Sequence, residues 1–477
     1  MEKPDKDAYD AIIIGAGMSG LVCGCYLAKA GLKVLMAEQH HKPGGYCTSF
    51  RRGRFTFDAA AHSFGGYAHG NLGKIFKDLG IDNKINIKQH DPSNVITSPD
   101  HTVSFWADID KTIDVFQSVF PKDADNIKRF FNFLTEPDSM SFARIRSWTF
   151  KDLLDKYFTN DRIQAMLSFP LYGNGALPPS RMSAFIGARI FKEFLLDGGY
   201  HPAGGMQVLS DALAAIFKEA GGDLRLSTAV KKITTKNSEV SGVVLEKGGF
   251  VPSLYVISNS DARRTFLTLL GKNNVEQDLK DRMARMVPSL STFIVYLGVD
   301  QAATTLPVSG VNYWYLSQYD LSTAYLSAKK GDFRDMGRYL VHVSPDRSTV
   351  IAFMNAPYGS KRYWETNRIV LSDRLIKAVE ANTIPGLSKY IVYKETATPR
   401  TLQRYTLNHA GSAYGWESTP FQLADPDFRK PSFIRGLYLT GHWTTHGLGI
   451  PGVAYVGYDT ARMVLRKKTH NCQKMLN

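Results

Sequence analysis

Cysteine is scarce in this chain, with four residues among 477. Cys23 and Cys25 lie two positions apart on an expected helix, where their side chains point to different faces and cannot pair. With Cys47 and Cys472 they are too few to form a disulfide framework. We therefore expect a reducing compartment and assign the protein to the cytoplasm.

Long apolar runs are also missing. Residues 11–37 come nearest to one, but they contain Gly15, Gly17, Gly20, Lys29 and Lys33, and a mixed-charge segment precedes them. A signal peptide needs a positive start and an unbroken apolar core, and a membrane-spanning helix needs about 20 apolar residues. The sequence predicts neither.

Acidic residues are outnumbered, which gives a formal net charge of +14 at pH 7. Acids are interspersed among the basic residues almost everywhere except after Asp459, where Arg462, Arg466, Lys467, Lys468 and Lys474 follow without one. No recognisable nucleic-acid-binding motif accompanies this charge, so we expect no nucleic-acid partner. A basic end of this kind is typical of a solvated tail, and peripheral contact with an anionic membrane surface is the alternative.

What the chain does contain is a dinucleotide-binding pattern near its start. Residues 9–14 are an apolar run of strand type, and they lead directly into a glycine-rich turn, an expected helix, a second strand at 33–37 and an acidic residue. The residues that we expect to bind a dinucleotide here are Gly15, Gly17, Met18, Ser19, Gly20 and Glu38. The glycines permit the turn, the approach of the pyrophosphate and the packing of the helix, and the carboxylate can accept from ribose hydroxyls.

Two further glycine-rich segments accompany this pattern. Gly44 and Gly45 follow the second strand at once, and an extended segment ending at Asp58 comes after them. Near the other end, residues 436–441 predict a strand, and Gly441, Gly449, Ile450, Pro451 and Gly452 lead into another helix, whose N-terminus can stabilise negative charge.

From residue 9 to about residue 462 this arrangement resembles the FAD amine oxidases and phytoene desaturases. Other segments that carry the resemblance are 198–206, 291–298 and 398–415. Within that family, the sequence is similar to the branch that contains bacterial phytoene desaturases, carotenoid isomerases and retinol saturase. The resemblance implies that both ends of the chain meet at one cofactor. It implies FAD, with Val230 at its adenine end, an apolar polyene or isoprenoid-like substrate, and an electron acceptor or donor that the residues do not identify. Tyr46 stands where many relatives have arginine, and His446 where many desaturases have proline.

The resemblance also implies an α/β fold, in which a doubly wound Rossmann-type FAD-binding domain is interrupted by a mixed α+β cap. We assign residues 1–110, 200–265 and 430–470 to the FAD-binding domain, 111–199 and 266–429 to the cap, and 471–477 to a basic tail. Apolar and aromatic residues at helical spacing, as in 127–134 and 148–158, predict a helical cap with its own core. A second interpretation is that one of these helices contacts a membrane surface.

Polar candidates for catalysis near the flavin are His446, His442, His62 and Tyr46, with Tyr414 as a further polar group. One of them could move the proton that accompanies hydride transfer at flavin N5. His442 and His446 have the spacing of paired metal ligands, but they lie in a glycine loop without the glutamate of zinc hydrolases, so we expect no metal.

Two other functions remain open on the same fold. A flavin amine oxidase shares the fold and the cofactor, but the arginine usual after the double glycine is absent. A lipid- or prenyl-binding escort protein would keep the architecture without flavin, and the intact glycine segments argue against it. Desaturation, saturation and cis–trans isomerisation are equally compatible with the sequence.

Overall fold

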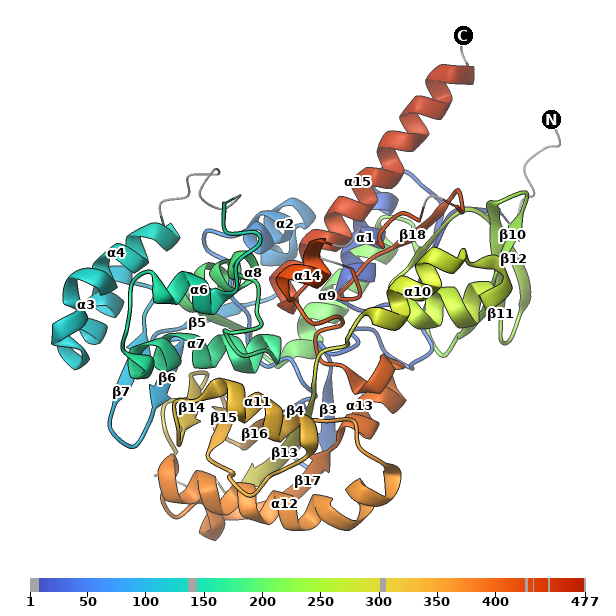
Figure 1. Ribbon diagram of the computed structural model, residues 1–477. Helices are drawn as coiled ribbons and strands as arrows, with labels where there is room; N and C mark the ends of the chain where they lie inside the picture. Colours follow the sequence, from blue (N-terminus) through green and yellow to red (C-terminus); the bar gives the residue numbers. More distant parts are fainter. Residues whose placement is uncertain are drawn as a thin grey trace.

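The computed structural model describes residues 8–135, 144–300, 306–424, 428–431, 433–444 and 447–475, with side chains up to residue 466. Within these ranges the chain folds around two seven-stranded sheets. Figure 1 shows one sheet in the upper body beside α15 and the other below it, above α12. The end of α15 projects at the top.

The first sheet has a parallel centre in the order β18, β12, β1, β2, β9. These strands are β1 (Tyr9–Ile14), β2 (Val34–Ala37), β9 (Asp223–Arg225), β12 (Gly249–Ser258) and β18 (Leu437–Leu439). An antiparallel pair, β10 (Val230–Lys236) and β11 (Glu239–Leu245), continues from β12. Residues in β2 and β18 are all buried, as expected for parallel strands covered on both faces.

Helices cover both faces of this sheet. One face is covered by α1 (Met18–Lys29), α2 (Asn71–Leu79), α9 (Met206–Glu219) and α15 (Gly449–Met475). The other is covered by a π-helix (Arg264–Gly271) and α10 (Gln277–Arg285). The helices α1 and α15 pack closely, because a Cβ placed on Gly457 would lie 2.4 Å from the carbonyl oxygen of Ser19.

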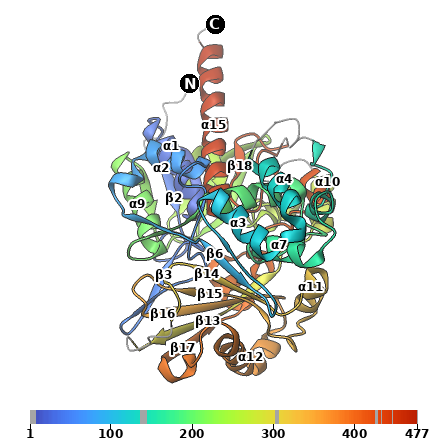
Figure 2. The same cartoon turned by 90° about the vertical axis from the view of Figure 1, so that its left-hand side faces the viewer.

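The second sheet has the order β17, β13, β16, β15, β14, β6, β7, and only the β14–β6 pair in it is parallel. Its strands are β6 (Asn94–Thr97), β7 (Thr102–Phe105), β13 (Ser291–Val299), β14 (Asn312–Leu316), β15 (Arg338–Val343), β16 (Thr349–Ala356) and β17 (Ile391–Ala397). The long helix α12 (Lys361–Asn382) covers one face, as Figure 2 shows from the side. The helix α11 (Leu321–Lys330) lies over the other face.

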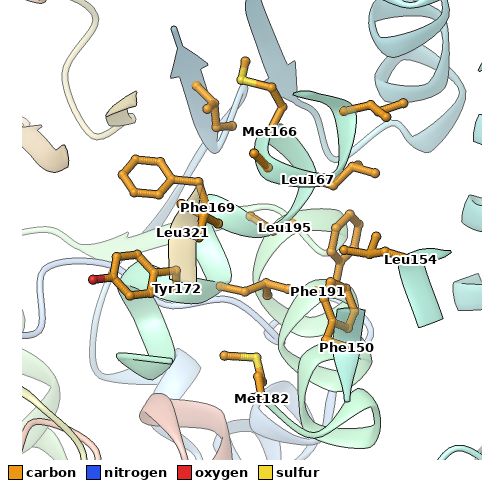
Figure 3. Packing of buried hydrophobic residues seen from close by; sticks show 14 of the residues in the cluster. Phe150, Leu154, Met166, Leu167, Phe169, Tyr172, Met182, Phe191, Leu195 and Leu321 are labelled. Atoms are coloured by element: carbon orange, nitrogen blue, oxygen red, sulfur yellow. The ribbon is translucent and has the colours of Figure 1, made fainter. Parts of the chain in front are cut away.

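A helical region stands beside this sheet. It contains α3 (Ile109–Val119), α4 (Ala124–Thr135), α6 (Phe150–Asp155), α7 (Asp161–Gly175), α8 (Ala184–Ile190) and a π-helix (Phe191–Leu196). The helix predicted in 127–134 is confirmed by α4, and α6 covers residues 150–155 of the segment 148–158. Figure 3 shows its core, where Phe150 and Phe191 pack together and Phe169 and Tyr172 lie on one side.

The remaining elements connect these parts. They are β3 (Ser49–Arg52), β4 (Phe55–Asp58), β5 (Ile87–His90), β8 (Gly199–Pro202), α13 (Pro399–Thr406), α14 (Pro420–Ala424) and short 3₁₀ turns at Ile81–Asn83, Pro121–Asp123, Lys272–Asn274, Leu387–Tyr390 and His409–Gly411.

Two details differ from the sequence-based expectations. The strands β6 and β7 hydrogen-bond into the second sheet through β14, although residues 1–110 were grouped with the first domain. The helix α15 runs through residue 475 and projects from the body (Figures 1 and 2), so most of the expected tail is helical.

Among the described residues, no helix has the length and apolarity needed to cross a bilayer. Three cysteines, Cys23, Cys25 and Cys47, are buried free thiols. Burial raises the pKa of Cys47 to about 12, so this thiol is protonated and unreactive at neutral pH.

A buried carboxylate connects the helical region to the chain near α14. Glu417 is 2% exposed and accepts from Arg181 at 2.7 Å and from the hydroxyl of Tyr325 at 2.5 Å. We expect Glu417→Ala to lower the free energy of unfolding by about 1–3 kcal/mol, because it leaves the Tyr325 hydroxyl buried without its acceptor. Denaturant unfolding measures this loss, and Glu365→Ala on the exposed surface is the control. A loss below about 0.5 kcal/mol would contradict the expectation.

Candidate functional site

The glycine-rich turn lies at the carboxyl end of β1. Gly15 has a φ of +94° and donates to the carbonyl of Ala37 at 2.8 Å, which closes the turn against β2. Gly17 is the N-cap of α1 and has no side chain to cap the first N–H groups, which are therefore free to face an anion. A Cβ on Gly20 would lie 2.3 Å from the carbonyl oxygen of Gly15, so helix and turn pack backbone to backbone.

Glu38 follows β2 and supports this turn. One carboxylate oxygen accepts from the backbone N–H of Ala16 at 2.7 Å and the other from that of His40 at 2.8 Å. Burial raises the pKa of Glu38. The side chain also lines the cavity described below, and each oxygen keeps a second lone pair for a hydroxyl donor. Glu38 therefore orders the turn in addition to facing a ligand.

The double glycine lies against the same turn. Gly44 donates to the carbonyl of Ala16 at 2.8 Å, and it forms a parallel bridge with Gly17. Gly45 has a φ of +60°, and a Cβ on it would lie 3.5 Å from the Cα of Gly17. Two stretches of backbone without side chains thus face one another at the cavity.

The glycine-rich segment near the C-terminus also lies beside the glycine turn of β1 and α1. The hydroxyls of Ser19 and Thr440 lie 2.6 Å apart, buried, although 421 positions separate them. Gly441 has a φ of +91°, and the N-terminus of α15 begins at Gly449. The structure therefore brings the N-termini of α1 and α15 to one cavity.

Most of the residues expected to bind the cofactor line this cavity. The lining includes Gly15, Gly17, Met18, Ser19, Glu38, Gly44, Gly45, Val230, Gly441, Gly449 and Ile450. Gly20, Pro451 and Gly452 do not belong to the lining. Gly20 lies behind the turn, and Pro451 and Gly452 lie in the first turn of α15, where Pro451 packs near Gly66.

Asn259 is a central residue that the sequence analysis did not select. Its backbone donates to the carbonyl of Ile14 at 2.9 Å, and its side-chain nitrogen donates to that of Gly15 at 3.3 Å. A Cβ on Gly17 or Gly441 would lie within 3 Å of the Asn259 side chain. Its position directly after the strand β12 could have identified Asn259 as a site residue, because ligands bind at the carboxyl ends of parallel strands.

The cavity continues from the glycine segments to the second sheet. Its volume is about 340 Å³. Its distant part is lined mainly by aromatic and apolar side chains from α7, β14, α11, β15, β16 and the connection between α11 and β15, namely Phe169, Tyr172, Trp314, Ala324, Ala328, Phe333, Tyr339, Leu340, Phe353 and Met354. Figure 3 shows Phe169 and Tyr172 on α7 at the edge of the helical core. Asp332, Asp335 and Arg338 add charged groups at this end.

Four of the five polar groups, Tyr46, His62, Tyr414 and His442, line the cavity, and His446 lies outside the described residues. The Tyr46 hydroxyl donates to the carbonyl of Ser412 at 2.8 Å, and burial raises its pKa. The Nε2 of His442 lies 3.3 Å from the Oδ1 of Asn408, and its ring centroid is 6.0 Å from that of Tyr46. His62 packs on Phe353 with ring centroids 4.7 Å apart. Among the described residues, no cluster of three or more metal-ligating side chains occurs.

Burial lowers the pKa of His442 to about 4, so the ring is neutral at pH 7. Because the folded pKa lies below the unfolded value of about 6.5, the unfolded chain binds more protons between these values and stability falls as the pH falls through this window. We expect the shift to cost the folded protein up to about 3 kcal/mol by pH 4. Thermal unfolding across pH 4–7 should therefore show less acid destabilisation in His442→Gln than in the wild type. Equal pH dependence would contradict this expectation.

The parallel sheet, the glycine turn at its carboxyl edge and the two convergent helix N-termini define a dinucleotide-binding flavoprotein fold. Gly17 and Gly45 line the cavity beside the N-terminus of α1 and fit a pyrophosphate there, and the cavity provides room for a ring system beyond it.

Comparisons with known proteins agree with this class. Residues 18–465 match the family described as flavin-containing amine oxidoreductase. The chain is 26% identical to prolycopene isomerase 2 of an Oncidium hybrid cultivar, over 96% of this chain and 84% of the relative. It is 24% identical to the neurosporene-forming phytoene desaturase of Rhodobacter capsulatus (97% and 95% covered) and 23% identical to the all-trans-retinol 13,14-reductase of Rattus norvegicus (92% and 82% covered).

Solved structures show the same fold. A crystal structure of an oxidoreductase from Methanosarcina mazei has a TM-score of 0.66 at 16% identity, covering 95% of this chain and 99% of the other. Putrescine oxidase bound to putrescine has a TM-score of 0.64 at 14% identity, covering 96% and 99%. The chain therefore belongs to the flavin-containing amine oxidoreductase family, and it is an oxidoreductase whose cofactor is FAD. The resemblance and the fold class predicted from the sequence are confirmed.

Proposed function

We propose that this oxidoreductase changes C–C or C=C bonds in an apolar polyene or isoprenoid-like lipid, by desaturation, saturation or cis–trans isomerisation. The observation that supports this most is the continuity of the cavity, which runs from the glycine segments into a part lined by Phe169, Trp314, Leu340 and Phe353. An apolar lining stabilises an apolar ligand and excludes water from the reacting bond. The names of the isomerase, desaturase and reductase relatives point to the same substrate class.

In this proposal the glycine segments hold FAD. The residues assigned to the cofactor are Gly15, Gly17, Met18, Ser19, Gly20, Glu38, Gly44, Gly45, Val230, Gly441, Gly449, Ile450, Pro451 and Gly452, and Asn259 joins them. When bound, FAD supplies a hydride acceptor or donor beside the substrate. The first-turn N–H groups of α1 bind the pyrophosphate. Tyr46, His442 and His62 provide the polar groups that face the reacting bond.

Amine oxidation is the second candidate function. Solved relatives with this fold include putrescine oxidase and cyclohexylamine oxidase. In this chain Asp332 and Asp335 lie at the distant end of the cavity, where they could attract an ammonium group. The surrounding aromatic and aliphatic lining favours the polyene.

The decisive experiment compares the two substrate classes. The protein is expressed with ample riboflavin, and the cofactor released on denaturation is identified. The yellow protein is then incubated, oxidised and after chemical reduction, with carotenoid, retinoid, fatty-acid and amine panels, and products are resolved by mass and isomer. We expect altered polyenes. Unchanged polyenes together with oxidised amines and peroxide would replace this proposal with the second candidate.

We also propose peripheral contact with an anionic membrane surface, from which an apolar substrate could enter. The end of α15 projects from the body (Figure 1), and Arg466 on it is exposed. Basic residues beside a membrane gain about 1 kcal/mol each from anionic lipid. Flotation with vesicles of anionic lipid and of zwitterionic lipid tests this contact. Equal recovery from both would refute it.

A further inference from the structure

Four histidines from separate elements of the fold lie in a row that starts at the cavity. His62 follows β4 and lines the cavity, His342 lies on β15, His201 on β8 and His90 on β5. Successive ring centroids are 4.9 Å apart from His62 to His342, 6.3 Å from His342 to His201 and 6.5 Å from His201 to His90. His342 and His201 are 2% and 3% exposed, so the middle of the row is closed to bulk water.

Each ring has one buried nitrogen that makes no hydrogen bond with the described residues. These atoms are Nε2 of His62, Nε2 of His342, Nδ1 of His201 and Nε2 of His90. Buried polar atoms are satisfied in the great majority of cases, so four such atoms in one row require an explanation. Imidazole nitrogens at these ring spacings can pass a proton directly or through single bridging waters.

The hydrogen-bond partner of each ring determines which ring nitrogen carries the proton and which one keeps a free lone pair. The Nδ1 of His62 lies 3.0 Å from the carbonyl of Ala60, and that of His342 lies 3.1 Å from the Oδ1 of Asn312. Carbonyl and amide oxygens only accept, so both rings donate from Nδ1 and carry a lone pair on Nε2. The side-chain nitrogen of Asn312 donates to Ser63 at 3.1 Å, which supports this orientation of its amide.

His201 is oriented by a carboxylate in the same way. Its Nε2 lies 3.0 Å from the Oδ2 of Asp58, which leaves the lone pair on Nδ1. The other Asp58 oxygen accepts from the Ser49 hydroxyl at 2.6 Å and from the backbone of Met206 at 2.8 Å. Asp58 is 9% exposed, so its negative charge is available in the middle of the row to stabilise a transferred proton.

Other titratable groups around the row do not replace these histidines. Near Asp58 lie the thiol of Cys47 and the hydroxyl of Tyr296, and burial raises the pKa of both groups, so they stay protonated at neutral pH. Beside His90 on β5 stands Lys88, whose charge adds to the lowering of the His90 pKa. Burial lowers the pKa values of His62, His342 and His90, so these three rings are neutral at neutral pH and each can accept a proton.

We propose that His62, His342, His201 and His90 form a proton relay between the solvent near β5 and the cavity, with His62 exchanging the proton with the substrate. This rests on the proposed function. Saturation adds one hydride and one proton to a double bond, and desaturation removes one of each. The relay delivers or removes the proton, and water at the His90 end is its source and sink. His62, which was selected from the sequence as a catalytic candidate, thereby gains a route to solvent.

The coupling of the row is tested without any substrate. In protein labelled with ¹⁵N- and ¹³C-histidine, the pKa values of His62 and His90 are followed by NMR titration. We expect His201→Gln to raise both, because the nearby His201 ring lowers each of them by like-charge repulsion. His101→Gln is the control, because His101 packs on Phe120 outside the row. Unchanged pKa values of His62 and His90 in His201→Gln would overturn the relay.

Transfer is tested with a polyene that the wild type converts. We expect His342→Gln, whose amide cannot relay a proton, to lower kcat at least tenfold with little change in KM or in FAD content. We expect His62→Gly to lower kcat about 100-fold or more, with partial rescue by added imidazole. Unchanged kcat in His342→Gln would overturn the relay. Failure of the wild type to convert any polyene would instead count against the proposed function, and the NMR titration would still decide on the coupled row.

Discussion

Gly17→Ala should fold and yet lose most of its affinity for FAD. A Cβ at this position would lie 2.9 Å from the Nδ2 of Asn259, which is the far end of a side chain that can turn away. The backbone angles of Gly17, φ −72° and ψ 171°, are ordinary for alanine. The added methyl group displaces the Asn259 side chain, which donates to the Gly15 carbonyl and supports the turn that the pyrophosphate approaches at the N-terminus of α1.

The size of this effect follows from the hydrogen bonds at stake. A bond from a backbone N–H to a charged phosphate contributes about 1.5–3 kcal/mol, so losing one lowers the affinity roughly 10- to 150-fold. FAD content of the purified protein, followed by titration of FAD into stripped protein, measures this loss. Circular dichroism checks the fold.

Gly386→Ala is the matched control. Gly386 lies at the start of a 3₁₀ turn, and no other group lies within 4 Å of a Cβ placed there. Its φ of +75° makes alanine cost about 1 kcal/mol of stability, but the position is not part of the cavity lining. We expect this variant to keep its FAD. If Gly17→Ala retained FAD as well as Gly386→Ala does, the pyrophosphate would not lie against the glycine turn at Gly17.

The cofactor half of the site could be predicted because its signals are local. Each glycine in the turn from Gly15 to Gly20 has a steric explanation that the sequence alone provides. The strand before the turn and the helix after it are evident from apolar spacing. The second glycine segment was predicted by its resemblance to a family, since a contact such as that between Ser19 and Thr440 spans 421 positions. Local pattern alone could not have joined them.

The substrate half could not be predicted at the level of residues. The spacing of α4 and α6 correctly predicted helices, but helical spacing does not tell which apolar face packs into a core and which lines a cavity. Phe169 and Phe191 belong to the same core cluster, and only Phe169 faces the cavity. The histidine row was equally hidden, because His90, His201 and His342 come from strands whose pairing the sequence does not specify.

Narrowing the cavity at α11 should reduce turnover of a long polyene without affecting FAD. Ala328 is 8% exposed and lines the cavity on the same helical face as Ala324. In Ala328→Phe the ring occupies space that the substrate needs. If the ring prevents about 100 Å² of apolar substrate surface from being buried in the protein, about 2.5 kcal/mol of transition-state stabilisation is lost. This corresponds to roughly a 70-fold decrease in kcat/KM. Shorter polyenes need less of the cavity and should lose less.

The control lies two positions earlier on the same helix. Leu326 is 53% exposed on the solvent face of α11, so Leu326→Phe makes a comparable ring addition outside the cavity. We expect it to keep the activity of the wild type, and we expect both variants to keep their FAD, because α11 supplies no residue to the glycine segments. Steady-state kinetics with a long and a shortened polyene, normalised to flavin content, separates the two variants. If Ala328→Phe converted the long polyene as fast as Leu326→Phe does, the substrate would have to lie elsewhere, because a ring at position 328 and an extended substrate cannot occupy the same space.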